Sequence, residues 1–199
     1  MNAEESFDDL LARVRACRAC EEHLPLGPRP VLLGRPSARL LIVGQAPGTK
    51  VHETGISWND PSGERLREWL GLDRAAFYDE RRVALVGVGL CYPGRLPRGG
   101  DSPPRPECAP RWHPPLRAAF SNIELTLLVG QYAQVCCLED RRKQNMTETV
   151  RAWREYLPDF IPTPHPSWRT TAWLNRNAWY ERELVPELRR RVQKLVLSA

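Results

Sequence analysis

The stretch LLIVGQAPG, residues 40–48, decides the fold of this chain. Its first four residues end a short apolar run, 38–43, that is too short for a helix and typical of a buried strand. The glycines and the proline that follow predict a tight loop. Comparable apolar runs lie at 83–88 and 125–129, and a shorter one lies at 160–163. We therefore expect four buried strands.

Helical patterns separate these strands. We expect helices at 6–19, 64–72, 111–120 once its prolines are passed, 132–138 and 175–197, where Pro186 should kink or restart the helix. Alternating strands and helices predict the α/β class, here a three-layer α/β/α sandwich with a central, mostly parallel four-stranded sheet.

Ligands of such sheets bind at the carboxyl ends of the strands. The 44–48 loop, the loop with Cys91 and the loop with His165 each follow a strand. We expect the three loops to meet at one crevice and to carry the function.

The composition fits a single domain at 1–199. The chain has no apolar run near the roughly 20 residues of a membrane-spanning helix, and its acidic start is unlike a secretory signal. We expect a cytoplasmic monomer without membrane contact. The formal net charge of +5 permits a polyanionic partner without requiring one.

Four of the six cysteines have a spacing that suits a metal centre. Cys17 and Cys20 form a Cys-x-x-Cys pair, and sixteen residues separate Cys91 from Cys108 in a loop rich in proline and glycine. The second pair is too wide for a zinc knuckle, whereas iron-sulfur clusters accept scattered ligands. A 4Fe-4S cluster, zinc and unrelated free thiols all remain open from spacing alone.

Cys136 and Cys137 lie in the apolar helical segment 132–138. Small buried side chains are the better interpretation there, so we expect both to be core residues and leave them out of the metal centre.

Residues 55–63, GISWNDPSG, precede the expected 64–72 helix. Asp60 suits an N-cap with Pro61 in the first turn, and a helix N-terminus favours a negative charge. A carboxylate held there is suited to stabilising a developing cation. Trp58 is either a core residue or a flat surface on which a base stacks.

Residues 163–169, TPHPSWR, form a rigid loop around one histidine. A lone histidine is more often structural, but prolines on both sides of His165 favour a presented side chain. Ser167 and Arg169 supply a hydroxyl and a cation suited to phosphate contacts.

Two of these loops carry motifs in a fixed order. Residues 44–48 have the form Gly-x-x-Pro-Gly, and residues 165–167 are His-Pro-Ser. With the cysteines, they resemble the uracil-DNA glycosylase superfamily over nearly the whole chain. The cysteine layout is similar to that of its iron-sulfur branches, families four and five. The resemblance implies a 4Fe-4S cluster, with zinc as the alternative, on Cys17, Cys20, Cys91 and Cys108.

The resemblance also implies where the catalytic acid lies. Family four carries a glutamate after the first glycine of its first motif, and here that residue is Gln45. Family five uses an aspartate in a Gly-Asp-x-Ser-Gly segment, which residues 59–63, NDPSG, resemble apart from Asn59. Asp60 is therefore the implied acid, with Glu53 in reserve.

Two departures concern base selection. Uracil-specific members often place an asparagine where this chain has Gly87, and members that exclude thymine by bulk place a tyrosine where Gly48 lies. The resemblance therefore implies a more open pocket and a broader range of deaminated bases.

The implied reaction is hydrolysis of the bond between uracil, or a related deaminated base, and deoxyribose in DNA, which leaves an abasic site. Asp60 would stabilise the sugar cation and orient water, and His165 would donate a hydrogen bond to the leaving base. The implied base-binding residues are Gly44, Gln45, Ala46, Gly48 and Trp58, and the implied DNA-binding residues are Ser62, Gly63, Ser167, Trp168 and Arg169. Because Gln45 replaces an acid, a non-catalytic protein that binds damaged DNA or abasic sites is the alternative.

Overall fold

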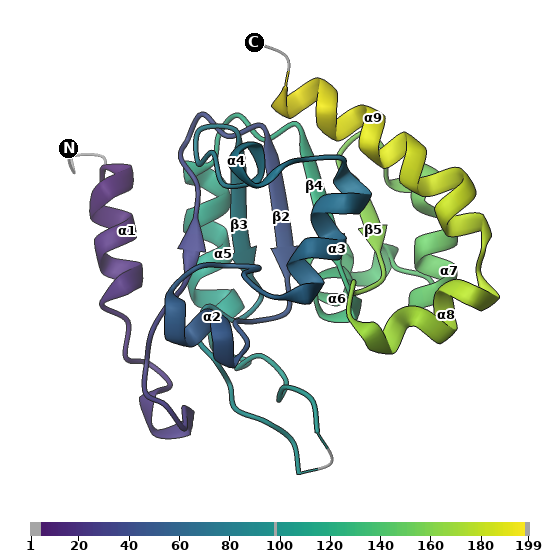
Figure 1. Cartoon of the computed structure of the whole chain (residues 1–199). Coiled ribbons are helices and arrows are strands. Elements are labelled where there is room, and N and C mark those ends of the chain that lie inside the picture. The colour runs from purple at the N-terminus through teal and green to yellow at the C-terminus, as the bar shows by residue number, and fades with distance from the viewer. Residues whose placement is uncertain (1–4, 98, 198–199) are drawn as a thin grey trace.

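A computed structural model describes residues 5–97 and 99–197 of the chain. Its centre is a five-stranded sheet in the order β1-β3-β2-β4-β5 (Figure 1). The strands are β1 (Leu32–Leu33), β2 (Leu40–Gly44), β3 (Val83–Gly87), β4 (Leu125–Val129) and β5 (Phe160–Thr163). The last four are the predicted strands and run parallel to one another, whereas β1 pairs antiparallel with β3. A two-residue edge strand was not expected, because it is too short to show a periodic pattern.

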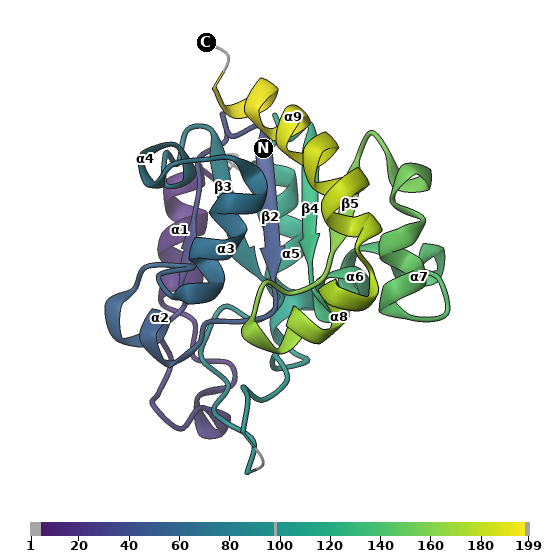
Figure 2. The same ribbon diagram turned by 45° about the vertical axis from the view of Figure 1, so that its right-hand side comes forward.

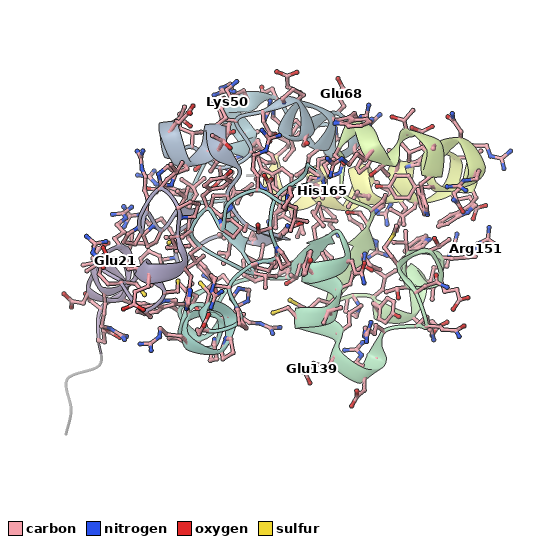
Figure 3. All side chains as sticks on the ribbon, turned by 90° about the horizontal axis from the view of Figure 1, so that it is seen from below. Glu21, Lys50, Glu68, Glu139, Arg151 and His165 are labelled. Carbon is pink, nitrogen blue, oxygen red and sulfur yellow. The ribbon has the colours of Figure 1, made fainter. Side chains whose placement is uncertain are left out.

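Helices cover both faces of the sheet, which confirms the predicted α/β class and its three layers (Figures 1 and 2). The α-helices are α1 (Phe7–Arg15), α2 (Thr49–Thr54), α3 (Pro61–Leu70), α4 (Arg74–Phe77), α5 (Cys108–Ala119), α6 (Gln131–Leu138), α7 (Met146–Arg151), α8 (Thr171–Arg176) and α9 (Val185–Val196). Figure 3 shows Lys50 and Glu68, from α2 and α3, on one side of the molecule and Glu139, just beyond α6, on the other.

The two faces of the sheet have separate hydrophobic cores. Leu40 and Ile42 pack with α3 and α9 on one face, and Leu41 and Val43 pack with α1 and α5 on the other. Successive side chains of a strand point to opposite faces, so an all-apolar strand is needed wherever both faces are covered.

The order of the strands determines where a ligand can bind. β2 lies between β3 and β4 and is parallel to both. The chain forms β3 on one side of β2 first and then crosses to form β4 on its other side. This is a topological switch point, and the crevice beyond the carboxyl end of β2 is the expected binding position. The 44–48 loop begins there.

Helix caps follow the local sequence signals. The Ser6 side chain accepts a hydrogen bond from the Asp9 amide at the start of α1, and Asp60 caps α3 with Pro61 in its first turn. α1 ends at Arg15, four residues earlier than predicted.

Two helix predictions were partly wrong. α5 begins at Cys108 and contains Pro114 and Pro115, rather than starting after its prolines. Each proline removes a backbone donor, but burial of Trp112 and Leu116 against the sheet outweighs that loss.

The predicted 175–197 helix is interrupted. α8 ends at Arg176, a π-helical segment spans Tyr180–Leu184, and α9 starts at Val185 with Pro186 in its first turn. The expected restart at this proline is confirmed. Within the part of the chain that the structure describes, none of the helices combines the length and apolarity needed to cross a bilayer.

Candidate active site

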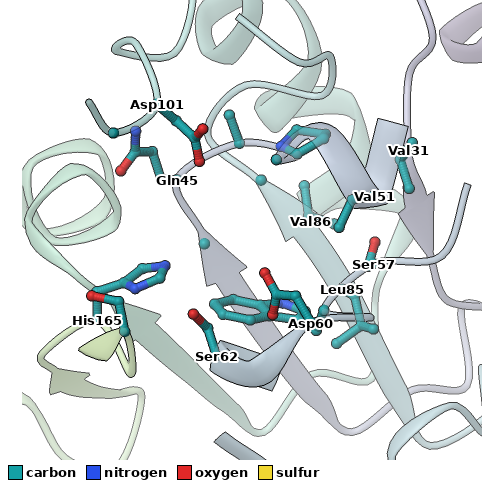
Figure 4. Close-up of a pocket in the computed structure, with 18 of the residues that line it drawn as sticks. Val31, Gln45, Val51, Ser57, Asp60, Ser62, Leu85, Val86, Asp101 and His165 are labelled. Atoms are coloured by element: carbon teal, nitrogen blue, oxygen red, sulfur yellow. The ribbon is translucent and has the colours of Figure 1, made fainter. Parts of the chain in front are cut away.

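A cavity of about 420 Å³ lies beyond the carboxyl ends of β2 and β3. Its walls come from the loop after β2, the 57–62 segment, the loop around residues 95–101 and the loop after β5 (Figure 4). Every predicted catalytic, base-binding or DNA-binding residue except Gly63 lines it: Gly44, Gln45, Ala46, Gly48, Trp58, Asp60, Ser62, His165, Ser167, Trp168 and Arg169. The 44–48 and His165 loops therefore meet, as expected.

The loop after β3 reaches this cavity through its later part only. Arg95, Gly100 and Asp101 line the cavity, whereas Cys91 lies in a second cavity with the other predicted metal ligands. The expectation that this loop meets the crevice is confirmed, although Cys91 itself lies in the other cavity, because the loop is long enough to contribute to both places.

Asp60 enters the cavity from the N-terminus of α3. One of its carboxylate oxygens, Oδ1, accepts a hydrogen bond of 2.8 Å from the Gly63 amide, which leaves the other oxygen available to a ligand. Glu53, the reserve acid, is exposed on α2 and is not among the lining residues.

Gly63 is buried rather than presented to a ligand. A Cβ atom at this position would overlap the carbonyl oxygen of Trp58. The glycine is required by this close approach, and its N–H orients Asp60. The structure therefore gives Gly63 a structural role, and its contact with DNA stays a prediction.

Trp58 has an unusual backbone for a large residue, with φ +57°. Such strain costs about 1–3 kcal/mol and is concentrated at functional sites. It places the indole so close to Gly44 that a Cβ there would lie 2.8 Å from Cζ2 of Trp58. The indole and the imidazole of His165 have their ring centroids 5.7 Å apart and their planes inclined by 30°.

His165 follows β5 and reaches the cavity opposite Asp60 (Figure 4). Burial lowers the pKa of His165, and the nearby charge of Asp60 opposes this shift only in part. The imidazole is therefore neutral at neutral pH and has one N–H to donate. Gly130, with φ +83°, allows the approach, since a Cβ there would lie 3.3 Å from Cβ of His165.

Two polar side chains stand on the cavity wall nearest the 95–101 loop. The amide nitrogen of Gln45 donates to the Ser102 carbonyl at 3.1 Å, which turns its amide oxygen away from that contact. Partial burial raises the pKa of Asp101, the main opposing influence being the charge of Arg95. Asp101 was not predicted, because its only sequence signal is its place in a proline-rich loop.

The loop after β5 projects a tryptophan into solvent. Trp168 is 76% exposed, which is unusual for a large apolar side chain. Arg65 on α3 holds the loop through a hydrogen bond of 3.1 Å to the Ser167 carbonyl, and Arg169 packs against Gly100.

The four predicted metal ligands, Cys17, Cys20, Cys91 and Cys108, line one small cavity. Trp112 donates its indole N–H to the Cys17 sulfur at 3.4 Å. Burial raises the pKa of the Cys91 thiol to about 12 and that of Cys108 to about 11. A bound cation would offset that cost and favour the thiolates.

Cys136 and Cys137 lie apart from that cavity, as predicted, but they are half-buried rather than fully buried in the core. Both face His113 of α5, and the three ligand atoms lie within 4.8 Å of one another. A hydrogen bond with Cys137, followed in importance by one with His113, lowers the pKa of the Cys136 thiol. Sequence reasoning missed this cluster, because His113 belongs to another helix.

The fold and the cavity define an α/β protein with a ligand site at the switch point of a parallel sheet. A sequence model of the Uracil DNA glycosylase superfamily matches residues 32–189, and the chain belongs to this superfamily. Members of the superfamily are DNA glycosylases, which are hydrolases, and the fold implies a DNA substrate. Cys17 and Cys20 lie outside the matched region.

Proposed function

We propose that this protein is a monofunctional DNA glycosylase that removes uracil, and related deaminated bases, to leave an abasic site. One observation carries the proposal: Asp60 and His165, from segments far apart in the sequence, enter the same cavity from opposite sides, beside Trp58 (Figure 4). A carboxylate and a neutral hydrogen-bond donor are the two groups that cleavage of a glycosidic bond requires.

The reaction begins when the base leaves the helical stack, which costs a few kcal/mol and least for a mispaired base. The bond between C1′ and the base then breaks, its electron pair goes to the base, and positive charge develops on the sugar. The Asp60 carboxylate stabilises that charge and orients a water molecule. The water oxygen bonds to C1′, and the released proton neutralises the departing base.

His165 acts on the other product of this cleavage. Its N–H donates to a carbonyl oxygen of the base, where negative charge develops, and one such donor contributes about 3–4 kcal/mol. The lowered pKa of His165 supports this role, because a neutral ring donates without placing a second charge beside Asp60.

The wall of the cavity supports a broad choice of base. Gly48 leaves open space in which a Cβ would lie 3.5 Å from the Asp101 carboxylate, and a Cβ at Gly87 would overlap the Gly89 carbonyl. An asparagine at position 87 would require the loop to move. The base would then stack on Trp58. Its edge would meet the backbone amides near Gln45 and Ala46 and the oxygen acceptors of Gln45 and Asp101.

The exposed loop supports DNA binding. We propose that the exposed Trp168 occupies the space that the flipped base vacates, as apolar side chains do in other proteins that unstack DNA. Ser62, Ser167 and Arg169 are suited to contact phosphates beside the cavity, and the net charge of +5 favours salt-dependent binding.

For the second cavity we propose a 4Fe-4S cluster on Cys17, Cys20, Cys91 and Cys108. Zinc with Zn–S bonds of about 2.3 Å would bring sulfur atoms to about 3.8 Å from one another. Within residues 5–97 and 99–197, no three of these four sulfurs lie within 4.8 Å of one another. A wider spacing suits a cluster. Its contribution is structural: it would join the segment after α1 to the loop after β3.

The cofactor proposal is tested by elemental analysis of anaerobically purified protein. We expect a brown protein with about four iron atoms and four sulfides per chain. A colourless protein that holds one zinc ion and no iron would reject the cluster.

The alternative is a non-catalytic protein that binds damaged DNA, and Gln45 is the observation in its favour, because it replaces an acid. The deciding experiment incubates the protein with a labelled uracil-containing oligonucleotide and then cleaves abasic sites with alkali. We expect strand breaks at the uracil. Tight binding without breaks, at high enzyme concentration and long times, would reject the glycosylase and favour the alternative.

A further inference from the structure

A second group of metal-binding side chains lies on the sheet face opposite α3. His113 is buried on α5, and Cys136 and Cys137 are half-buried on the neighbouring α6. The two sulfurs and a ring nitrogen of His113 lie within 4.8 Å of one another, and Sγ of Cys136 is 4.0 Å from Nδ1 of His113. None of the three residues lines the active-site cavity or the four-cysteine cavity.

The orientation of His113 is set by the sheet. Its Nε2 atom lies 2.9 Å from the carbonyl oxygen of Gly87, the last residue of β3. A carbonyl oxygen only accepts hydrogen bonds, so Nε2 carries the hydrogen and, in the neutral ring, Nδ1 carries a lone pair. That lone pair faces the two sulfurs. Histidines that bind metals have this arrangement, with the other ring nitrogen donating to a backbone carbonyl or a carboxylate.

The distances fit a tetrahedral ion. Zn–S bonds of about 2.3 Å and Zn–N bonds of about 2.0 Å place ligand atoms about 3.5–3.8 Å from one another. The observed separations are within about 1 Å of those values, a change that side-chain rotation can supply. Two thiolates and one neutral imidazole around Zn²⁺ also give a complex without net charge.

A neutral complex suits these surroundings. The small cavity beside His113 and Cys137 is lined mainly by apolar side chains of the sheet and of α5, among them Val43, Val86 and Leu116. An uncompensated ion would be costly there.

We propose that His113, Cys136 and Cys137 bind one Zn²⁺ ion, with a water molecule as the fourth ligand. The ion joins α5 to α6. It also fixes the imidazole that donates to Gly87, a residue of the active-site wall. The inference does not depend on the glycosylase activity or on the occupant of the four-cysteine cavity, since its ligands belong to neither.

Zinc binding tests the proposal on the full chain with its four-cysteine site occupied. After dialysis against a chelator, the protein is titrated with Zn²⁺, and bound zinc and iron are counted by elemental analysis. We expect wild type to bind one zinc ion more per chain than the Cys136→Ser/Cys137→Ser variant, with equal iron in both. The melting temperature should rise with zinc in wild type only.

Two further variants sharpen the result. His113→Gln keeps a donor for the Gly87 carbonyl but removes the Nδ1 lone pair, so zinc affinity should fall at least about tenfold. Tyr132→Ala, at an exposed position of α6, should bind zinc as wild type does. Equal zinc binding by wild type and the double-serine variant would overturn the proposal.

A measurement on wild type alone covers the case in which the variants do not fold. With ¹¹³Cd²⁺ in place of zinc, the NMR spectrum should show a resonance at the shift of a site with two thiolates and one imidazole. A spectrum without that resonance would also overturn the proposal.

Discussion

The indole of Trp58 and the imidazole of His165 lie next to each other in the cavity wall, with ring centroids 5.7 Å apart and planes inclined by 30°. The strained backbone of Trp58, at φ +57°, and the positive φ of Gly130 both serve this arrangement. An apolar wall beside the histidine keeps water away and favours the neutral ring. The pair thus combines a stacking surface with a hydrogen-bond donor at one side of the proposed base site.

The acid is tested by Asp60→Asn. Asparagine caps a helix as well as aspartate does, so stability should be almost unchanged, whereas the loss of negative charge should reduce single-turnover base excision about 100- to 1,000-fold. Asp73→Asn is the matched control, since Asp73 caps α4 through the same kind of hydrogen bond outside the cavity. If Asp60→Asn stayed within a few-fold of wild type while Glu53→Gln lost activity, the acid would be Glu53.

The pH dependence of stability is tested by His165→Gln. Burial lowers the pKa of His165 below its ordinary 6.5, so at acidic pH the unfolded chain binds the proton more readily than the folded chain. The contribution of the neutral ring to stability is complete above about pH 6.5 and is lost as pH falls through the folded-state pKa. Wild type should therefore lose unfolding free energy below about pH 6.5 more steeply than the variant.

Urea unfolding at several pH values measures this difference. His23→Gln, at an exposed position, should follow wild type. Parallel curves for wild type and His165→Gln would contradict the lowered pKa.

The proposed role of Trp168, to fill the space that the flipped base vacates, is tested by Trp168→Ala. A side chain that fills the vacated stack matters only when there is a stack to disrupt. We expect excision from a duplex to fall about tenfold and excision from a single strand to change less than about twofold. Tyr132→Ala, another exposed aromatic position, should leave both rates unchanged. Equal losses on the two substrates would assign Trp168 to general strand binding.

The openness of the base site is tested by Gly48→Tyr. The nearest neighbour of a Cβ at this position is Oδ2 of Asp101 at 3.5 Å, an ordinary contact, so a larger side chain can enter the cavity without disturbing the backbone. We expect excision of hypoxanthine or xanthine to fall at least about tenfold and excision of uracil to be retained within a few-fold. Gly48→Ala should behave as wild type. Excision of hypoxanthine and xanthine at the wild-type rate by Gly48→Tyr would contradict the idea that Gly48 keeps the site open to larger bases.

Much of the fold could be predicted because its signals are local. The apolar runs of β2 to β5 and the caps Ser6 and Asp60 depend on neighbours within a few residues, where sequence patterns operate. The sandwich follows, since parallel strands must bury both faces. The 44–48 and His165 loops could be placed at one crevice for the same reason.

Tertiary structure decided what depends on contacts between distant segments. The pairing of β1 with β3, the presence of Asp101 in the cavity and the burial of Gly63 beneath Trp58 have no local signature. The approach of His113 to Cys136 and Cys137 arises only because α5 packs beside α6. A residue's own neighbours in sequence determine its helix or strand, whereas the chemistry of a site depends on which segments the packed core brings together.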